Sequence, residues 1–261
     1  MITGAGSGLG RALSVQLAQS GARLLLADIN QAACGETADL VAQRGGRAET
    51  MVLDVSDAPQ VERLAEAADR SLGYVDLVVN NAGVAVGGGV GETPVEDWQW
   101  VMSINLWGVI YGCHYFVPRL VRQGGGALLN VASAAGVVCA PTMAAYNVTK
   151  AGVIALSETL AAELEPTKVR VTVLCPYFFR TNILAAARVS EQTRALAEAA
   201  FAAAKISADE VAAAALHAVR AGQLYCFPMR EARMAWRLKR LVPERYARRI
   251  APAILRRMVR S

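Results

Sequence analysis

The sequence has little of what metal centres and disulfide scaffolds require. Histidine occurs only as His114 and His217, and neither stands at a spacing typical of metal ligands, so we expect no metal site. The five cysteines are scattered without a C-x-x-C pair, which predicts small core residues in a reducing compartment. They are Cys34, Cys113, Cys139, Cys175 and Cys226.

Charge is missing from one long stretch, residues 123–149. Its length is compatible with a transmembrane span, but Asn130, Ser133, Pro141 and several glycines interrupt it, which favours a buried strand and loop. The chain enters a glycine-rich stretch almost at once and leaves no room for a signal peptide. We therefore expect a cytoplasmic protein.

Strand and helix patterns alternate along most of the chain, which predicts a single-domain α/β fold with a doubly wound parallel sheet. With 54% hydrophobic residues, the composition suits a sheet buried on both faces. Ligands of such sheets bind beyond the carboxyl ends of the strands. We expect strands at 22–28, 48–53, 75–80, 127–132, 169–174 and 224–227, helices near 11–18, 30–44, 57–71, 105–122, 146–165 and 208–221, and a longer insertion at 176–205.

A glycine-rich loop precedes the first helix. Gly4, Gly8 and Gly10 form a G-x-x-x-G-x-G pattern, which lets a pyrophosphate approach the backbone at a helix N-terminus. Alone, such a loop can be a simple turn. Asp28 ends the next apolar stretch, where a carboxylate can accept the ribose hydroxyls and repel a 2′-phosphate, favouring NAD over NADP. The alternative role for Asp28 is a helix cap before Asn30.

Ser133, Tyr146 and Lys150 supply a hydroxyl, a phenol and an ammonium group. Tyr146 and Lys150 are four residues apart, so on a helix they share one face. A neighbouring ammonium is expected to lower the pKa of the phenol, which could then exchange a proton with an alcohol or carbonyl oxygen that Ser133 also binds. A bare Y-x-x-x-K pattern is more often an ordinary helix surface. The other motifs must therefore support the catalytic interpretation.

Together these motifs resemble the short-chain dehydrogenase/reductase family over residues 1–228. The resemblance rests on Thr3–Gly10, Asp28, Asp54-Val55, Asn80-Asn-Ala-Gly83, Asn105, Ser133, Tyr146-x-x-x-Lys150, Pro176 and Thr181, in the family's order. It implies a seven-stranded Rossmann-like sheet, a homo-oligomer and a relay of Asn105, Ser133, Tyr146 and Lys150. It also implies cofactor contacts from Gly4, Ser7, Gly8, Leu9, Gly10, Asp28, Asp54, Val55, Asn80, Ala82, Gly83, Tyr146, Lys150, Pro176 and Thr181.

The resemblance implies individual roles for some of these residues. Asp54 would meet the adenine and Asn80 the neighbouring ribose. Lys150 would bind the nicotinamide ribose and Thr181 the carboxamide. Asn105 would hold a water molecule that connects Lys150 to solvent.

The chain departs from the family pattern at two places. Only Met1 and Ile2 precede the glycine loop, where family members usually carry several residues that complete a central strand. We therefore expect either a truncated first strand or a mis-assigned start. Tyr177 follows Pro176 where the family usually has glycine, so the backbone there is expected to take a different course.

The expected substrate pocket is almost without charge. Its predicted lining is Val84, Val86, Val137, Val138, Met143, Phe178, Phe179, Ile183 and Leu184. An apolar secondary alcohol or ketone fits such a pocket best. Arg180 is the one cation nearby. It could anchor a carboxylate, although packing against the cofactor or pairing with an acid is the preferred interpretation.

We therefore expect an NAD-dependent oxidoreductase that transfers a hydride between nicotinamide and an apolar secondary alcohol or ketone. The alternative is a non-catalytic dinucleotide-binding protein with a regulatory or scaffolding role, against which the intact four-residue relay argues. Nucleic-acid binding would draw only on the net charge of +5 and is not expected.

Residues 229–261, which we call the C-terminal tail, hold most of the positive charge. They contain eleven Lys and Arg against Glu231 and Glu244, a net charge of +9 that leaves −4 on the rest of the chain. Two short basic amphipathic helices are expected, the first with an apolar stripe of Met234, Leu238, Leu241 and Val242 beside Arg233, Arg237 and Arg240, and the second with Ile250, Ile254 and Met258. The tail either packs over the substrate cleft, on its own domain or a neighbouring subunit, or attaches peripherally to an anionic membrane.

Overall fold

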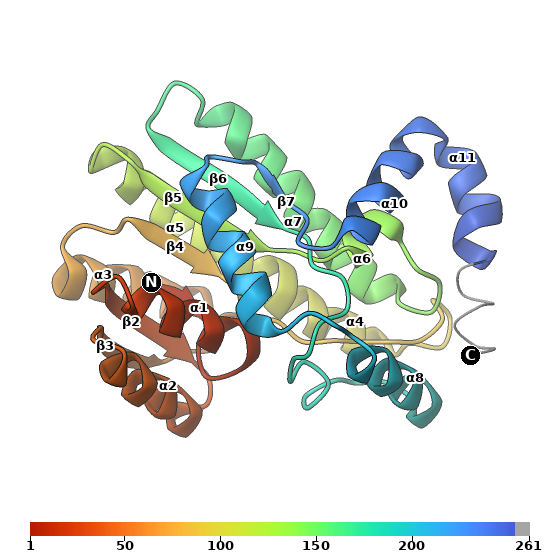
Figure 1. The fold of residues 1–261 in the computed structure, drawn as a ribbon, viewed down its shortest axis with the longest axis horizontal. Coiled ribbons are helices and arrows are strands. Elements are labelled where there is room, and N and C mark those ends of the chain that lie inside the picture. Colours follow the sequence, from red (N-terminus) through yellow and green to blue (C-terminus); the bar gives the residue numbers. More distant parts are fainter. Residues whose placement is uncertain (254–261) are drawn as a thin grey trace.

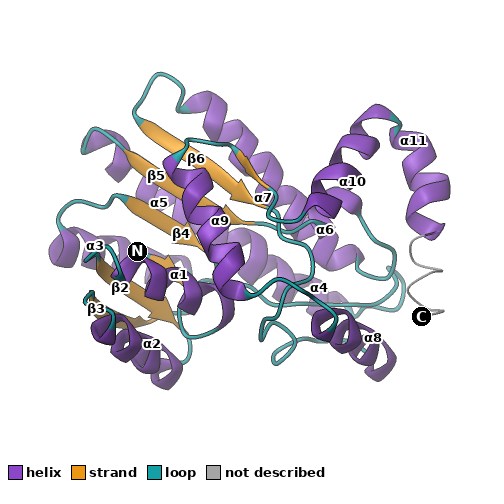
Figure 2. Cartoon of the chain, in the orientation of Figure 1, coloured by secondary structure: helices purple, strands orange, loops and turns teal. Residues whose placement is uncertain are grey.

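The computed structural model describes residues 1–253 and shows a seven-stranded parallel sheet between two layers of helices (Figures 1 and 2). The strand order is β3-β2-β1-β4-β5-β6-β7. The strands are β1 (Ile2–Thr3), β2 (Arg23–Asp28), β3 (Arg47–Val52), β4 (Leu77–Asn80), β5 (Gly126–Val131), β6 (Val169–Leu174) and β7 (Tyr225–Cys226). The predicted doubly wound α/β fold is thus confirmed.

Helices α1 (Gly8–Ala18), α2 (Gln31–Gln43) and α9 (Ala208–Arg220) cover one face of the sheet, whereas α3 (Ala58–Leu72), α5 (Gly108–Arg122) and α7 (Ala144–Glu163) cover the other (Figure 1). Successive strand residues point into opposite layers. In β5, Leu128 packs with Phe116 and Val153 in one core, and Leu129 packs with the α1 and α9 side chains in the other. Both faces are therefore dry, as the apolar composition predicts.

The first strand is short but fully paired. Ile2 pairs with Leu26 of β2 on one side and with Val79 of β4 on the other. The backbone of Met1 extends the ladder, since its carbonyl accepts from Val79 N and its amine donates to Leu77 O. The strand itself has two residues, Ile2 and Thr3.

The structure corrects three expectations. A helix begins well before residue 105: α4 (Val95–Met102) continues through a π-helical turn, η1 (Ser103–Trp107), into α5. The expected insertion contains a helix, α8 (Glu191–Ala202). Cys139 is exposed, although the other four cysteines are buried as predicted.

The described part of the tail packs on the α/β domain of residues 1–228, which agrees with the first of the two alternatives. Ala232 of α10 (Arg230–Leu241) is buried, and the Trp236 ring packs against Phe227 in a tilted arrangement. Lys239 Nζ donates to Val137 O at 2.6 Å. Residues 243–253 continue in helical turns, α11 (Pro243–Arg245) and η2 (Tyr246–Ile250). Ile254 and Met258 lie outside the described residues.

The predicted apolar stripe of α10 does not face the domain. Met234, Leu238 and Leu241 are 57%, 40% and 79% exposed, because the helix packs through Ala232 and Trp236 instead. Within residues 1–253, no helix is long and apolar enough to cross a membrane.

Two helical glycines give the first testable prediction. A Cβ at Gly112 of α5 would overlap Asn80 Oδ1, whereas a Cβ at Gly35 of α2 would meet nothing within 4 Å. Gly35→Ala should raise the free energy of unfolding by about 0.5–1 kcal/mol, because alanine restricts the unfolded chain. Gly112→Ala should lower it by about 1–3 kcal/mol through overpacking. Urea denaturation of both variants measures the difference, and equal shifts would contradict this packing.

Candidate active site

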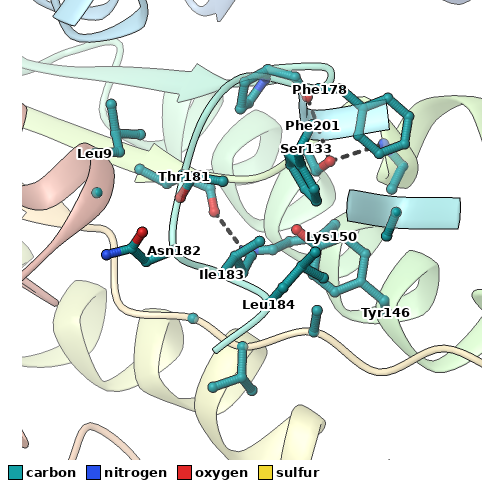
Figure 3. A pocket seen from close by; sticks show the side chains of 18 of the residues that line it. Leu9, Ser133, Tyr146, Lys150, Phe178, Thr181, Asn182, Ile183, Leu184 and Phe201 are labelled. Carbon is teal, nitrogen blue, oxygen red and sulfur yellow. Dashed lines mark hydrogen bonds between the residues drawn. The ribbon is translucent and has the colours of Figure 1, made fainter. Parts of the chain in front are cut away.

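One large cavity lies at the carboxyl ends of the strands and has a volume of about 1490 Å³. Figure 3 looks into it: Ser133, Tyr146 and Lys150 lie together, with Leu9, Thr181 and Asn182 on the other side of the view. The predicted residues that line it are Gly4, Ser7, Gly8, Leu9, Asp28, Asp54, Val55, Ala82, Gly83, Ser133, Tyr146, Lys150, Pro176 and Thr181. Separate motifs of the sequence therefore meet in one place.

The glycine loop is packed so tightly that side chains cannot be added. A Cβ at Gly10 would overlap Gly4 O, and Gly4 itself has φ of +63°. A Cβ at Gly8 would lie 3.0 Å from Thr181 Oγ1, so the loop and the segment after β6 face each other closely. Ser7 begins α1, and its exposed side chain makes no cap hydrogen bond within the described chain. The first N–H groups of α1 can therefore bind a phosphate.

The carboxylate of Asp28 faces this loop. Asp28 Oδ2 accepts from Gly6 N at 2.8 Å, and Oδ1 accepts from Asn30 N at 2.9 Å. Asn30, not Asp28, caps α2, because its side chain accepts from Ala33 N. The helix-cap alternative for Asp28 is thus not what the structure shows. Gly6 was missed at the sequence level, although a Cβ there would lie 2.9 Å from Asp28 Oδ2.

Arg11 is a second residue that sequence analysis missed, and it lines the same end of the cavity. Its guanidinium donates to Gly6 O and forms an ion pair with Glu36 at 2.8 Å. Nearby, Asp54 Oδ1 accepts from Ser56 Oγ at 2.7 Å, which fixes the orientation of that carboxylate at the rim. The cation at this end of the cavity is therefore paired with an acid.

The structure corrects the expected role of Asn80. Its side chain is buried beneath the cavity instead of lining it, and its Nδ2 donates to Asn130 Oδ1 at 2.8 Å. The next residue, Asn81, lines the cavity, and its Nδ2 donates to Thr3 O and Gly4 O. Because strand side chains alternate, one position along the motif decides which amide faces the cavity.

Tyr146 and Ser133 are held side by side at one wall. Ser133 follows β5, and its Oγ accepts from Ala135 N at 3.1 Å. Burial raises the pKa of Tyr146 to about 12, and a hydrogen bond with Ser133 acts in the opposite direction. The predicted lowering of this pKa by Lys150 is therefore wrong for this structure. A phenol of this kind stays protonated at neutral pH and can donate a proton to a carbonyl oxygen.

Lys150 lies one helical turn beyond Tyr146 and is also buried. Its Nζ donates to Val131 O at 2.9 Å and lies 5.7 Å from the centre of the Tyr146 ring. Burial lowers the pKa of Lys150 to about 8, so most of the group is charged at neutral pH. A Cβ at Gly83 would lie 3.2 Å from Asn105 Oδ1 and 3.6 Å from Nζ, so the turn after β4 passes close to both side chains.

Asn105 lies in the π-helical turn and is fully buried. Its Oδ1 accepts from Val84 N at 2.8 Å, and its Nδ2 donates to Val84 O at 2.9 Å. The side chain thus holds the segment after Gly83 against the π-helical turn. Asn105 does not line the cavity, and its observed contacts position Val84. The predicted role in holding a water molecule stays a proposal.

The part of the cavity where the sequence predicts substrate binding is mainly apolar. Of the nine residues predicted to line it, all but Val137 do so, and Val137 belongs to the core. Arg180 is exposed and does not line it. The loop after α6 (Ala135–Val138) is strained, since Cys139 and Thr142 have positive φ. Tyr177 has no positive φ, so a tyrosine at the position where the family usually has glycine causes no backbone strain.

Several lining residues come from segments without motifs. They are small side chains of α8 and of the tail together with a few larger ones: Ala197, Ala199, Ala200, Phe201, Ala203, Glu231, Ala232, Ala235, Tyr246 and Ala251. No sequence signal marked their positions, because α8 was hidden in the presumed insertion and α10 faces the domain through an unexpected side.

Comparison with known proteins agrees with this geometry. The family model described as short chain dehydrogenase matches residues 1–192. The chain is 43% identical over 185 residues to "Probable oxidoreductase EphD" of Mycobacterium tuberculosis. That match covers 70% of this chain but 31% of the relative, so the chain spans about a third of the length of these first curated relatives.

Two further matches extend over almost the whole chain. The chain is 35% identical over 240 residues to 1-deoxy-11-beta-hydroxypentalenate dehydrogenase of Streptomyces exfoliatus, covering 91% of this chain and 85% of that one. A short-chain dehydrogenase/reductase from Burkholderia phymatum, solved in complex with NAD, superposes with a TM-score of 0.88 at 33% identity, covering 93% of this chain and 92% of that one.

Proposed function

The chain belongs to the short-chain dehydrogenase/reductase family, and from this premise we propose that it is an NAD-dependent oxidoreductase acting on a large apolar secondary alcohol or ketone. One observation carries the proposal: Ser133, Tyr146 and Lys150 line the same cavity as a glycine cradle at a helix N-terminus. That arrangement brings a proton donor to a site that can hold a dinucleotide.

The residues have distinct roles in this proposal. A bound nicotinamide dinucleotide supplies or accepts the hydride. Ser133 holds the substrate oxygen, and Tyr146 donates its proton to that oxygen during ketone reduction and recovers it during alcohol oxidation. The Lys150 ammonium favours the phenolate when the proton leaves and binds the nicotinamide ribose. Asn105 fixes the neighbouring turn and holds the water molecule that links Lys150 to solvent.

Further cofactor contacts follow the same scheme. The α1 N-terminus from Ser7 to Gly10 binds the pyrophosphate, Asp28 the adenosine ribose and Asp54 the adenine. Ala82 and Gly83 also contact the cofactor, with Gly83 beside Lys150, and Pro176 and Thr181 lie beside the carboxamide. Gly8 and Thr181 lie close together, which supports the proposal that the glycine loop and the segment after β6 contact the same bound cofactor.

The walls of the cavity support a bulky apolar substrate. Phe178 and Phe201 pack edge to face at 5.2 Å, while alanines of α8 and α10 leave room. The substrate half offers few charges that could bind an ionic substrate. The name of the Streptomyces relative describes the dehydrogenation of a hydroxylated carboxylate, which agrees with the alcohol or ketone chemistry but not with an uncharged substrate.

Tyr146→Phe tests the proton transfer. The variant keeps the ring and loses the proton, so turnover of lipophilic secondary alcohols and ketones should fall about 100-fold or more while NADH binding survives. Absorbance of NADH measures turnover, and fluorescence titration measures binding. Tyr74→Phe is the matched control, because Tyr74 is half exposed and lies outside the cavity.

Near-normal turnover in Tyr146→Phe would refute its role as acid and base. The competing function is a dinucleotide-binding regulatory or scaffolding protein. It would be favoured if wild-type protein bound NADH but turned over no member of a broad panel of hydrophobic alcohols and ketones.

Preference for NAD over NADP follows from charge. The Asp28 carboxylate borders the adenosine end of the cavity, and the Arg11 guanidinium is paired with Glu36. The Asp28 carboxylate would therefore repel a 2′-phosphate. Arg11 would compensate little, because its charge is already balanced by Glu36.

Asp28→Asn should relax this preference. It removes the negative charge at nearly constant shape, so the ratio of the NADPH and NADH dissociation constants should fall about tenfold or more, equivalent to about 1.4 kcal/mol. Asp39→Asn makes the same charge change on the exposed part of α2, outside the cavity. Equal affinity of the wild type for both cofactors would contradict the argument.

We also propose a homo-oligomer in the cytoplasm and contact of the tail with an anionic membrane surface. Trp107 and Val148, both 47% exposed, lie on packed neighbouring helices and offer apolar surface to a second copy. On α10, the exposed stripe Met234, Leu238 and Leu241 is flanked by arginines, a combination suited to anionic lipid headgroups.

Replacing Met234, Leu238 and Leu241 together by Ser tests the membrane contact without disturbing the packed face of α10. Wild-type protein should cosediment with anionic but not neutral vesicles, and high salt should weaken binding because screening reduces the arginine contribution. The triple variant should stay in the supernatant. Equal recovery of both proteins in the supernatant at low salt would exclude the membrane contact.

A further inference from the structure

Much of the cavity wall comes from residues 175–190, which lie between β6 and α8 and form no helix or strand. We call them the wall segment. Ile183 of this segment packs against the apolar cluster that contains Tyr146 and lies beside it in Figure 3. A segment without a regular element depends on individual contacts to keep its position. The contacts that fix the wall segment therefore control the shape of the proposed substrate site.

Backbone hydrogen bonds join the wall segment to the residues after β4. Arg188 N donates to Ala85 O at 3.0 Å, and Arg188 O accepts from Gly87 N at 3.2 Å. A Cβ at Gly87 would lie 3.0 Å from Val189 Cγ1, so the two segments meet closely. The pairing is an isolated bridge between Val86 and Arg188 and does not extend into a strand. The backbone alone therefore gives this junction few hydrogen bonds.

The side chain of Arg188 anchors the wall segment a second time, to α4. Its Nη1 forms an ion pair with Asp97 Oδ1 at 2.8 Å, and its guanidinium carbon lies 3.9 Å from the centre of the Trp100 ring. A planar guanidinium can pair with a carboxylate and stack on an aromatic ring at the same time. Trp100 packs against the cluster that contains Val86 and Tyr146. Arg188 thus connects the wall segment to the side of the cavity that holds Tyr146.

An ordinary surface ion pair is the competing interpretation of Arg188. Its side chain is 46% exposed and that of Asp97 is 21% exposed, and exposed ion pairs contribute little to stability. The stacking on Trp100 and the backbone bridge of the same residue argue against this interpretation. Arg119 provides the contrast, because its ion pair with Asp69 at 2.9 Å joins α5 to α3 outside the cavity.

We propose that Arg188 is a positioning residue that fastens the wall segment beside the substrate and thereby limits the size of the substrate. Arg188 does not line the cavity, whereas its neighbours Ala186 and Val189 do. A fixed wall binds a fitting substrate more tightly, because less ordering is left to occur on binding. It also excludes bulkier molecules. The inference rests on the proposed function and deepens it, since it names a residue that sets the substrate range.

Arg188→Gln tests the fastening, because it removes the ion pair and the cation at similar side-chain length. With NADH as reductant and a series of apolar methyl ketones of increasing bulk, the KM of the best wild-type ketone should rise about fivefold. The turnover number and the NADH dissociation constant should change less than about twofold, because Arg188 lies outside the cavity. The kcat/KM of the bulkiest ketone relative to the best one should increase.

Related variants separate positioning from a general structural effect. Arg188→Lys keeps the charge opposite Asp97 but loses the planar group over Trp100, so it should restore part of the lost affinity. Asp97→Asn should raise KM in the same direction and add little to Arg188→Gln, since both remove one contact. Arg119→Gln is the matched control and should leave KM unchanged. Equal rises of KM in Arg119→Gln and Arg188→Gln, or an unchanged KM and size preference in Arg188→Gln, would overturn the inference.

Limited proteolysis with thermolysin measures the fastening without turnover. The wall segment offers apolar cleavage sites at Ile183 and Leu184, and cleavage there should be about fivefold faster in Arg188→Gln than in the wild type or Arg119→Gln. Absence of ketone turnover in the wild type would overturn the proposed function, whereas cleavage would still test the fastening. Equal cleavage rates in the three proteins would overturn the inference even if turnover is normal.

Discussion

A buried ammonium group at the meeting point of three segments is the constraint on which the active site depends. Lys150 is 3% exposed, and a cation withdrawn from water is costly unless it is hydrogen-bonded. Val131 O supplies an acceptor at the end of β5, and the turn at Gly83 lies beside the ammonium group. Asn105 then ties the next residue to the π-helical turn. The strand end, the turn and α7 can satisfy these contacts in one arrangement, which also places Tyr146 beside Ser133.

The sequence predicted those parts of the protein in which a short motif must satisfy a local physical need. Gly10 is required because a side chain would overlap Gly4 O, and the strand positions follow from residues buried on both faces. Asn80 shows the limit of this reasoning. The motif predicted an amide at the cavity, but the alternation of side chains turns Asn80 inward and leaves Asn81 at the surface of the cavity.

Features that depend on long-range packing were beyond prediction. The apolar stripe of α10 was identified correctly as a pattern, yet the helix packs through Ala232 and Trp236, whose ring lies against Phe227, and leaves Met234, Leu238 and Leu241 exposed. The pKa of Tyr146 was expected to fall because of its spacing from Lys150. Burial acts on both groups, however, and raises one pKa while it lowers the other. Spacing along a helix predicts which side chains are neighbours. It does not predict how deeply they are buried, and burial decides the pKa values here.

The cavity thus has two halves with different origins. In the half that surrounds Lys150 and the glycine loop, the packing leaves no space for larger side chains at Gly4 and Gly10. The residue types there are therefore restricted and form recognisable motifs. The other half is built from alanines of α8 and α10 around a few large side chains, and none of these contacts the buried ammonium. Those positions can change without disturbing the arrangement of Ser133 and Tyr146. Under the proposed function, the wall that the tail and α8 supply would recognise the substrate, while Ser133 after β5 and Tyr146 and Lys150 of α7 would carry out the chemistry.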